Sequence, residues 1–309
     1  MEWNVENLYD TLHDVGFDDR EFLPNAERRW NTPRYFHKQS SLAKTILAAG
    51  GLQPVDLVAL CEVENDSVMH FLCHRTRLAR LGYEYLVTHS ADRRGIDVAL
   101  LYQPETFALL HSETFRVPYD SLRERPTRDL LHAAGRLPFG DTLDVFVVHF
   151  PSRRGGATLS EPYRLRAAGI LRHLADSIAR RRHTPRLLAM GDFNDEPHNA
   201  SVSRVLAPTF AELTSHATPL PAEGHDNIEG SYYFRGEWSR IDQILVSPAL
   251  LSPTMKFHTT PQSVHLLAFP PLLEPLGRGT LSKPFRTYLG PFYHGGISDH
   301  LPLCVDFSY

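Results

Sequence analysis

The sequence predicts an α/β protein of the α+β kind, in which mixed β-sheets carry helices on their outer faces. Six apolar runs of strand length recur along the 309 residues, whereas helical patterns separate only some of them. Strands therefore outnumber helices, and a simple alternating parallel sheet would need a helix between neighbouring strands. The six runs are residues 55–60, 96–102, 142–150, 186–190, 241–246 and 301–307.

Three segments have the 3.6-residue periodicity of helices. The first, residues 40–49, begins at a serine, places Leu42 and Ile46 on one face, and ends at Gly50 and Gly51. The second covers residues 66–81. In the third, residues 160–181, apolar side chains recur at helical spacing. No repeat and no low-complexity linker interrupts these elements.

The composition indicates an ordinary soluble globular protein, with 42% hydrophobic and 22% charged residues. A formal net charge of −4 creates no overall positive field, so tight non-specific binding to nucleic acid is not indicated. The cysteines, Cys61, Cys73 and Cys304, are odd in number and have apolar surroundings. We therefore predict that they pack in the core and form no disulfide framework.

The start of the chain bears on the cellular compartment of the protein. No run of about 18 apolar residues occurs, so the sequence predicts no transmembrane helix. Only Met1, Glu2 and Trp3 precede Asn4, the first residue with a functional appearance. Either the first strand is very short or the sequence was cut upstream, with loss of a secretory signal. We expect a cytoplasmic protein if Met1 is the native start, and a secreted or periplasmic one if a signal was removed.

Two segments far apart in the chain place acid, amide or imidazole side chains beside an apolar run. Gly-Asp-Phe-Asn follows one run at residues 191–194, and Ser-Asp-His precedes another at residues 298–300. Gly191 lets the backbone turn, so that Asp192 and Asn194 emerge at the strand end. Ligands bind at strand ends in α/β proteins, although Asp, Asn and Ser also favour turns for local reasons. Taken singly, each segment is better explained as a turn.

Four further segments change that balance, because they also put polar residues at the ends of predicted strands. They are residues 3–7 (Trp-Asn-Val-Glu-Asn), 61–65 (Cys-Glu-Val-Glu-Asn), 149–153 (His-Phe-Pro-Ser-Arg) and 239–245 (Ser-Arg-Ile-Asp-Gln-Ile-Leu). In their order, the six segments resemble the endonuclease/exonuclease/phosphatase superfamily, which includes pancreatic deoxyribonuclease, AP endonucleases, sphingomyelinases and inositol polyphosphate 5-phosphatases. The resemblance runs over nearly the whole chain and is closest to a bacterial branch.

The resemblance implies one catalytic domain over residues 1–309. Its fold would be a four-layer α/β/β/α sandwich, in which two mixed sheets pack face to face with helices on the outer faces. The implied activity is that of a metal-dependent hydrolase acting on a phosphoester. Breaking a P–O bond requires charge neutralisation, an activated water and a stabilised leaving oxygen, and a divalent metal serves several of these needs. We therefore expect Mg²⁺ or Mn²⁺, which take oxygen ligands.

Metal ligands follow from the same resemblance. Glu62 is the best candidate, assisted by Asn4, Asp192 and Asp299. The alternative for Glu62 is a strand-end carboxylate exposed to solvent, and Glu64 beside it keeps that alternative open.

His300 is expected to activate water or to stabilise the transition state, since an imidazole pKa near neutrality suits proton transfer. By resemblance, Asp242 orients its ring. Asp192 is the other candidate acceptor of the water proton, and the role stays divided between the two. Asn194 resembles a phosphate-orienting amide. His149 resembles the second histidine of the nuclease and sphingomyelinase branches.

Arginines near these segments are candidate phosphate ligands, because a guanidinium grips phosphate through two parallel hydrogen bonds. Arg153 lies in a loop next to His149, and Arg128 lies in a second segment. Asp97 is a candidate to orient His149. An internal ion pair is the alternative for Arg128 and Asp97, and for Arg154 a solvated surface position is equally expected.

Three functions remain open. The leading one is a phosphodiesterase or phosphatase acting on a small molecule, a lipid headgroup or nucleic acid. The second is a DNA or RNA nuclease, in which Arg153, Arg154 and residues 232–235 (Tyr-Tyr-Phe-Arg) could form a groove, although such aromatic residues more often belong to the core. The third, a non-catalytic phosphate-binding module, is disfavoured because no metal or base residue is missing. Abasic-site repair is disfavoured because His149 replaces the asparagine of AP endonucleases. No obligate protein partner is indicated.

Overall fold

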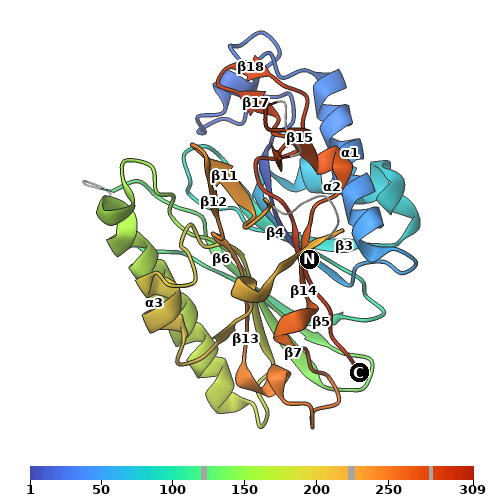
Figure 1. Ribbon diagram of the computed structural model, residues 1–309, viewed down its shortest axis with the longest axis vertical. Helices are drawn as coiled ribbons and strands as arrows, with labels where there is room; N and C mark the ends of the chain where they lie inside the picture. Colours follow the sequence, from blue (N-terminus) through green and yellow to red (C-terminus); the bar gives the residue numbers. More distant parts are fainter. Residues whose placement is uncertain (120–123, 222–226, 278–280) are drawn as a thin grey trace.

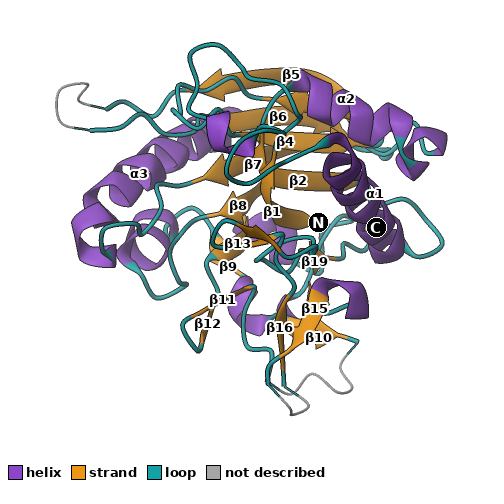
Figure 2. Ribbon diagram, turned by 90° about the horizontal axis from the view of Figure 1, so that it is seen from above, coloured by secondary structure: helices purple, strands orange, loops and turns teal. Residues whose placement is uncertain are grey.

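The computed structural model describes residues 1–119, 124–221, 227–277 and 281–309. Two mixed β-sheets pack face to face, and helices cover their outer faces (Figures 1 and 2). The helices α1 (Thr32–Gly50) and α2 (Asp66–Arg75) lie beside one sheet, and α3 (Ala157–Arg181) lies beside the other. This arrangement confirms the predicted four-layer sandwich.

The first sheet has seven strands, and its centre is formed by segments from both ends of the chain. The parallel pair β1–β2 is joined through α1, as a parallel connection requires, and β4 then pairs antiparallel with β2. In spatial order the strands are β10 (Thr218–Leu220), β14 (Val264–Leu267), β19 (Leu303–Val305), β1 (Glu2–Leu8), β2 (Leu57–Val63), β4 (Asp97–Tyr102) and β3 (Glu84–Val87).

The second sheet has six strands and a parallel pair of its own. Strands β7 and β8 run parallel and are joined through α3, whereas β13 pairs antiparallel with β8. In spatial order the strands are β5 (Ala108–Phe115), β6 (Leu130–Arg136), β7 (Thr142–His149), β8 (Leu187–Asp192), β13 (Asp242–Val246) and β9 (Ala211–Glu212).

Three short hairpins and several single-turn helices complete the described structure. The hairpins pair β11 (Tyr232–Phe234) with β12 (Glu237–Ser239), β15 (Leu273–Pro275) with β16 (Ser282–Pro284), and β17 (Tyr288–Leu289) with β18 (Phe292–Tyr293). The helical turns are Arg20–Phe22, Arg77–Arg80, Ser201–Leu206, Thr214–His216, Pro248–Leu251, Pro261–Ser263 and Pro270–Leu272.

The helix boundaries differ from the sequence prediction for local reasons. Helix α1 begins eight residues before the expected residue 40, because the Asn31 side chain accepts from the Arg34 amide and a proline occupies the first turn. Helix α2 ends at Arg75 and not at residue 81, because Thr76 is extended and starts a separate 3₁₀ turn. Helix α3 begins three residues earlier than predicted.

The strand predictions hold at the sheet centres and shift at the ends. Strand β2 continues past residue 60 to Val63, so Glu62 lies inside the strand and not after it. The suggestion that the first strand is very short is wrong: β1 spans Glu2–Leu8 and is almost entirely buried. Conversely, β19 covers only Leu303–Val305 of the predicted residues 301–307.

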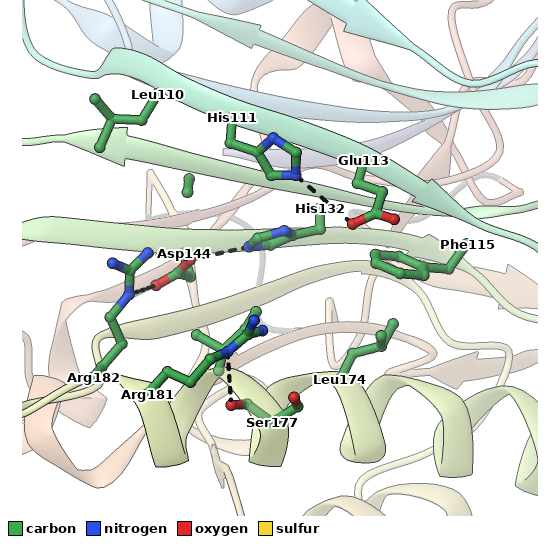
Figure 3. A pocket seen from close by; sticks show the side chains of 12 residues that line it. Leu110, His111, Glu113, Phe115, His132, Asp144, Leu174, Ser177, Arg181 and Arg182 are labelled. Atoms are coloured by element: carbon green, nitrogen blue, oxygen red, sulfur yellow. Dashed lines mark hydrogen bonds and ion pairs between the residues drawn. The ribbon is translucent and has the colours of Figure 1, made fainter.

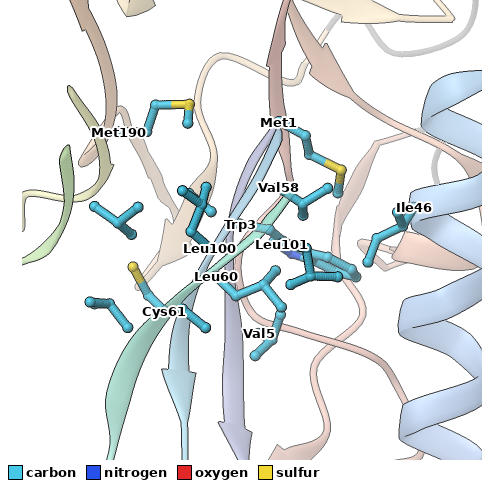
Figure 4. Packing of buried hydrophobic residues seen from close by; sticks show 14 of the residues in the cluster. Met1, Trp3, Val5, Ile46, Val58, Leu60, Cys61, Leu100, Leu101 and Met190 are labelled. Atoms are coloured by element: carbon cyan, nitrogen blue, oxygen red, sulfur yellow. The ribbon is translucent and has the colours of Figure 1, made fainter. Parts of the chain in front are cut away.

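The sheets are held by apolar packing on both of their faces (Figure 4). In β2 and β4, Val58 and Leu101 point toward Ile46 of α1, whereas Cys61 and Leu100 point toward Met190 of the opposite sheet. This alternation is the period of two expected for strands buried on both faces. A second cluster fills the space between α3 and the six-stranded sheet.

The cysteine prediction is confirmed. Cys61 and Cys73 are buried, Cys304 is partly buried, and all three are free thiols. Among the described residues, none of the helices combines the length and the apolar character needed to cross a membrane.

Candidate active site

The predicted polar segments meet where strands of the two sheets end against each other. In the six-stranded sheet, His149 pairs with Asp192 across β7 and β8, and Asp192 pairs with Asp242 across β8 and β13. Paired residues on neighbouring strands point to the same face, so the register alone brings these side chains together. From the opposite sheet, the Asn4 amide donates to Asp192 Oδ2 at 3.0 Å.

An acid–imidazole pair forms the centre of the site. Nδ1 of His300 lies 2.7 Å from Oδ2 of Asp242, and both side chains are buried. The Ser231 hydroxyl donates to the same carboxylate oxygen. The Ser298 hydroxyl accepts from the His300 amide at 3.1 Å, and the Trp3 indole donates to the His300 carbonyl at 2.9 Å. Asp242 thus orients the imidazole, while Ser298 and Trp3 hold the His300 backbone.

Electrostatics favour the charged form of this imidazole. Burial alone would lower the pKa of His300, but the charge of Asp242 and its hydrogen bond raise it well above the ordinary value. Asp299 and Asp192 add to this effect. This shift favours the protonated imidazole, which as a cation can stabilise negative charge near Nε2.

The surroundings of Asp192, in contrast, favour its neutral form. Its Oδ1 accepts from the Asn194 amide at 2.8 Å, and its Oδ2 lies 3.4 Å from Nε2 of His149. Burial and then the charge of Asp242 raise the pKa of Asp192 to about 7. A carboxylate with this pKa is suited to accept a proton near neutral pH.

His149 is held neutral. Burial, followed by the positive charges of Arg128 and Arg94, lowers the pKa of His149 well below its usual value. The structure does not place Asp97 as its orienting partner. The Asp97 carboxylate accepts instead from Thr88 Oγ1 at 2.6 Å and from a backbone amide. Nδ1 of His149 is buried without a hydrogen-bond partner among the described residues.

The predicted metal ligands lie around the same space. Strand β2 has a bulge between Cys61 and Val63, and Glu62 at this bulge accepts from the Asn7 amide at 2.9 Å. The pKa of Tyr232 is raised to about 12 by burial, then by Asp299, and less by Asp192 and Glu62. Three of the predicted ligand carboxylates are therefore close enough to Tyr232 to raise its pKa.

A compact group with metal-ligating chemistry is also present, and it differs from the predicted set. Ligand atoms of Asp192, Asp242 and His300 all lie within 4.8 Å of one another, and all three residues are buried. This group can hold a metal ion. It shares only Asp192 with the predicted ligands, whereas Asp299 pairs with Arg286 at 2.8 Å.

The predicted phosphate ligands form internal hydrogen bonds. Arg128 is buried and donates to Phe150 O at 2.6 Å and to Asp92 at 3.2 Å. Arg153 donates to Asn194 O and to Asn199 Oδ1, each at 2.7 Å. The Asn194 amide itself donates to Phe150 O at 3.0 Å. These contacts fix the strand ends, and direct binding of phosphate by the three residues stays a prediction.

Sequence reasoning missed a buried charged cluster behind the site. Burial and the charge of Asp299 raise the pKa of Glu6 to about 7, whereas burial lowers that of Lys38 to about 8. Arg286 lies 2.8 Å from Asp299 and 3.6 Å from Glu6. Glu6 stands inside a predicted segment and was therefore detectable, but no local pattern marks Lys38 or Arg286.

Glu2 was also missed. It lies on the same face of β1 as Asn4, and both of its carboxylate oxygens are buried without a hydrogen-bond partner among the described residues. Burial, followed by the charges of Asp242 and Asp192, raises the pKa of Glu2 well above its usual value. These surroundings favour the protonated form of Glu2, beneath the site.

A cavity of about 490 Å³ lies elsewhere, between α3 and the outer face of β5, β6 and β7 (Figure 3). On its wall, Asp144 accepts from His132 at 3.0 Å and from Arg182 at 3.0 and 3.1 Å. None of the predicted site residues lines this cavity. We therefore assign the chemistry to the strand ends, where the acids and imidazoles converge.

The chain matches the Endonuclease/Exonuclease/phosphatase family over residues 1–308, and it belongs to that family. This finding confirms the resemblance seen in the motifs. No curated protein matches the sequence significantly.

Solved structures show the same fold along the whole chain. A functionally unknown conserved protein from Enterococcus faecalis V583 is 17% identical, with a TM-score of 0.62 over 99% of this chain and 98% of that one. A mannosyl-6-phosphatase from Bacteroides thetaiotaomicron VPI-5482 is 14% identical, with a TM-score of 0.62 over 100% and 98%. TDP2 of D. rerio, complexed with a single-strand DNA product, is 17% identical, with a TM-score of 0.60 over 100% and 97%.

Proposed function

We propose that this protein is a divalent-metal-dependent phosphoester hydrolase. The observation that carries the proposal is the buried group of Asp192, Asp242 and His300, which lies at joined strand ends in a chain of this family. Asp242 and His300 form an oriented, hydrogen-bonded pair, and Asp192 is a carboxylate with a pKa of about 7 beside them. Such groups supply charge stabilisation and proton transfer in phosphoester hydrolysis.

We propose Mg²⁺ or Mn²⁺ as the cofactor, held by Glu62, Asn4, Asp192 and Asp299. The donor chemistry fits, because carboxylate and amide oxygens are the ligands these ions prefer. A second indication is that burial and then the charge of Asp242 raise the pKa of Asp192, since a nearby cation would favour the ionised carboxylate. When bound, the ion would neutralise charge on the phosphoryl oxygens.

The protonation states favour a division of roles that the sequence left open. The raised pKa of His300 favours its protonated form, which suits it to stabilise negative charge on a phosphoryl oxygen better than to accept a proton from water. Asp192 takes the role of the base that accepts the water proton. Nε2 of His149, whose pKa is lowered, lies 3.4 Å from Oδ2 of Asp192, where it can help to orient this carboxylate.

Hydrolysis of bis(p-nitrophenyl) phosphate with excess Mg²⁺ tests the proposal. We expect Glu62→Gln and His300→Ala to lower the rate by about two to four orders of magnitude, as loss of charge stabilisation or acid–base groups does. Glu105→Gln and His216→Ala are the matched controls, because both residues are exposed and carry no site contact. Full activity in either site variant, or activity that survives EDTA, would overturn the assignment.

A panel of substrates is needed to determine the substrate class, because the matched structures are described as proteins of different kinds. These include a mannosyl-6-phosphatase and a TDP2 complexed with a single-strand DNA product. The panel therefore contains mannose 6-phosphate, inositol phosphates, an aryl phosphomonoester, sphingomyelin, plasmid DNA and RNA, each with and without EDTA. A preference for phosphodiesters would separate a nuclease or phosphodiesterase from a phosphatase.

A further inference from the structure

We propose that the cavity between α3 and the six-stranded sheet is a second ligand site, which binds a small organic anion with an apolar body (Figure 3). Its volume of about 490 Å³ is typical of small-molecule pockets. Asp144 on its wall lies five residues before His149 of the candidate active site, or about 17 Å along β7. The two sites are therefore separate, and the inference does not depend on the proposed hydrolase.

The cavity forms because α3 leaves the edge of the sheet uncovered. Apolar packing joins α3 to Phe146 of β7 and Ala189 of β8, whereas β5 at the edge is mostly exposed. Between them lies Ala134 of β6, which pairs with His111 of β5 on one side and with Asp144 of β7 on the other. Its small side chain leaves room beneath the helix. The space is thus lined by both sheet and helix.

The two ends of the cavity differ in chemistry. Phe115 of β5 and Leu174 of α3 face each other at one end, whereas Arg181 and Arg182 lie at the other (Figure 3). An aromatic or branched apolar group can pack between the two hydrophobic side chains. A ligand that spans the cavity would then carry a charged group at its opposite end.

The charges at the arginine end favour an anion. Arg182 donates to both oxygens of Asp144, at 3.0 and 3.1 Å, and so compensates this buried acid. Arg181 donates to the Ser177 carbonyl at 3.2 Å, and no acid pairs with it in the part of the chain that the structure describes. The other acid of the lining, Glu113, lies at the exposed rim, 3.7 Å from His111. Arg181 is therefore available to bind a carboxylate or sulfonate.

A buried imidazole offers a further polar contact. The His132 side chain is only 8% exposed, and its Nε2 lies 3.0 Å from Oδ1 of Asp144. The ring also packs against Phe146, with 4.9 Å between centroids. These two contacts fix its orientation. Nδ1 of His132 has no hydrogen-bond partner among the described residues, and His132 lines the cavity. A polar atom of a ligand would satisfy this nitrogen, which otherwise stays unpaired in a largely buried position.

Fluorescence titration with two matched probes tests the site. The first, 8-anilino-1-naphthalenesulfonate, has an aromatic body and a sulfonate, and the second, N-phenyl-1-naphthylamine, is the same body without the sulfonate. We expect saturable binding of one sulfonate probe per chain, several-fold tighter than binding of the neutral probe. Ser177→Trp fills the cavity from α3 and should abolish binding of both probes. Arg181→Gln should weaken binding of the sulfonate probe about fivefold and leave the neutral probe unchanged.

Controls on the same helix isolate the cavity. His173→Trp and Arg180→Gln make the same kinds of change at exposed positions that do not line it, and we expect both variants to bind as the native protein does. Near-UV circular dichroism checks that Ser177→Trp is folded. Ala134→Leu narrows the cavity from the sheet side, so it repeats the test independently of the helix.

Several outcomes would overturn the proposal. Binding that survives both Ser177→Trp and Ala134→Leu would place the probe elsewhere on the protein. Equal affinity of the native protein for the two probes, or equal effects of Arg181→Gln and Arg180→Gln, would contradict recognition of an anion. If the native chain sediments as a dimer and Ser177→Trp as a monomer, the cavity is a contact between two copies. None of these results bears on the hydrolase, which is tested separately with bis(p-nitrophenyl) phosphate.

Discussion

The ion pair between Arg164 and Asp195 links α3 to the loop that follows the Gly-Asp-Phe-Asn segment. Nε of Arg164 lies 2.7 Å from Oδ1 of Asp195, and the two side chains are only 2% and 3% exposed. Arg164 also donates to Ser160 Oγ at 2.7 Å. Replacing Arg164 with methionine keeps an apolar chain of similar length but leaves Asp195 buried without its main counter-charge.

The expected loss of stability follows from what remains around Asp195. Removing one partner of a buried pair costs about 3–5 kcal/mol. Asp195 keeps the Ser201 hydroxyl at 2.7 Å, and Arg153 lies 3.6 Å away, so we expect the lower end, about 3 kcal/mol. At about 2.1 cal/mol/K per residue, 309 residues give an unfolding entropy of about 0.65 kcal/mol/K. Arg164→Met should therefore lower Tm by about 5 °C.

Calorimetry on a double-mutant cycle checks this reasoning. Arg164→Met combined with Asp195→Asn removes the uncompensated charge, so the double variant should be more stable than Arg164→Met alone by about 1 kcal/mol or more. Arg172→Met is the control on the same helix: its pair with Asp176 is exposed, and we expect a change below about 1 kcal/mol. If the stability losses of the two single variants simply add up in the double variant, the role assigned to the buried charge is refuted.

Three further predictions concern strand pairing, catalysis and pH. Gly191→Ala should lower the free energy of unfolding in urea titrations by about 3 kcal/mol, because the new Cβ would lie 1.8 Å from a carbonyl oxygen of β7. Gly169→Ala is the control and should not lower it, because a Cβ there meets open space. Asp242→Asn should lower kcat about 10³-fold or more by removing the anionic partner of His300, and a loss below tenfold would contradict the pairing. Burial opposes ionisation of Asp144, but its imidazole and guanidinium partners outweigh burial and lower its pKa. Asp144→Asn should therefore lower the free energy of unfolding at pH 7. This difference in free energy from the native protein should shrink as pH falls below about 3.9 and through the pKa of Asp144 in the folded state.

The sequence predicted the buried centre of the fold better than its edges. Strands such as β4 and β8 are buried on both faces, so they appear as continuous apolar runs. Strand β5 is mostly exposed, and β6 contains histidine, alanine and glycine, so neither stands out before it pairs. The start of α1 was readable in principle, since Asn31 followed by a proline is a known helix-start signal.

For the site, the motifs predicted which strand ends converge but not the partners of each side chain. Asp97 and Arg128 looked available for the site, yet each is satisfied by neighbours that only the folded chain supplies. The contact between Glu6 and Arg286 joins positions 280 residues apart, and no local spacing encodes it. Local patterns determine where polar groups emerge, whereas packing between the sheets determines which groups neutralise one another.

Backbone strain is concentrated at the same strand ends. Among the described residues, six that are not glycine have positive φ, and four of these belong to the predicted site segments. Each such conformation costs about 1–3 kcal/mol and persists only where its surroundings determine it. The four are Glu6 (51°), Asn7 (57°), Glu62 (66°) and Asn194 (50°).

Hydrogen bonds to the site itself account for this strain. In three cases, the backbone amide of the left-handed residue donates to the side chain of a predicted metal ligand. The pairs are Glu6 with Asn4 at 3.0 Å, Asn7 with Glu62 at 2.9 Å, and Asn194 with Asp192 at 2.8 Å. The unfavourable turns therefore aim fixed N–H donors at groups that must keep one orientation. A substitution to glycine at Asn7 would relieve the strain without removing the donor, so we expect it to leave the candidate metal site intact.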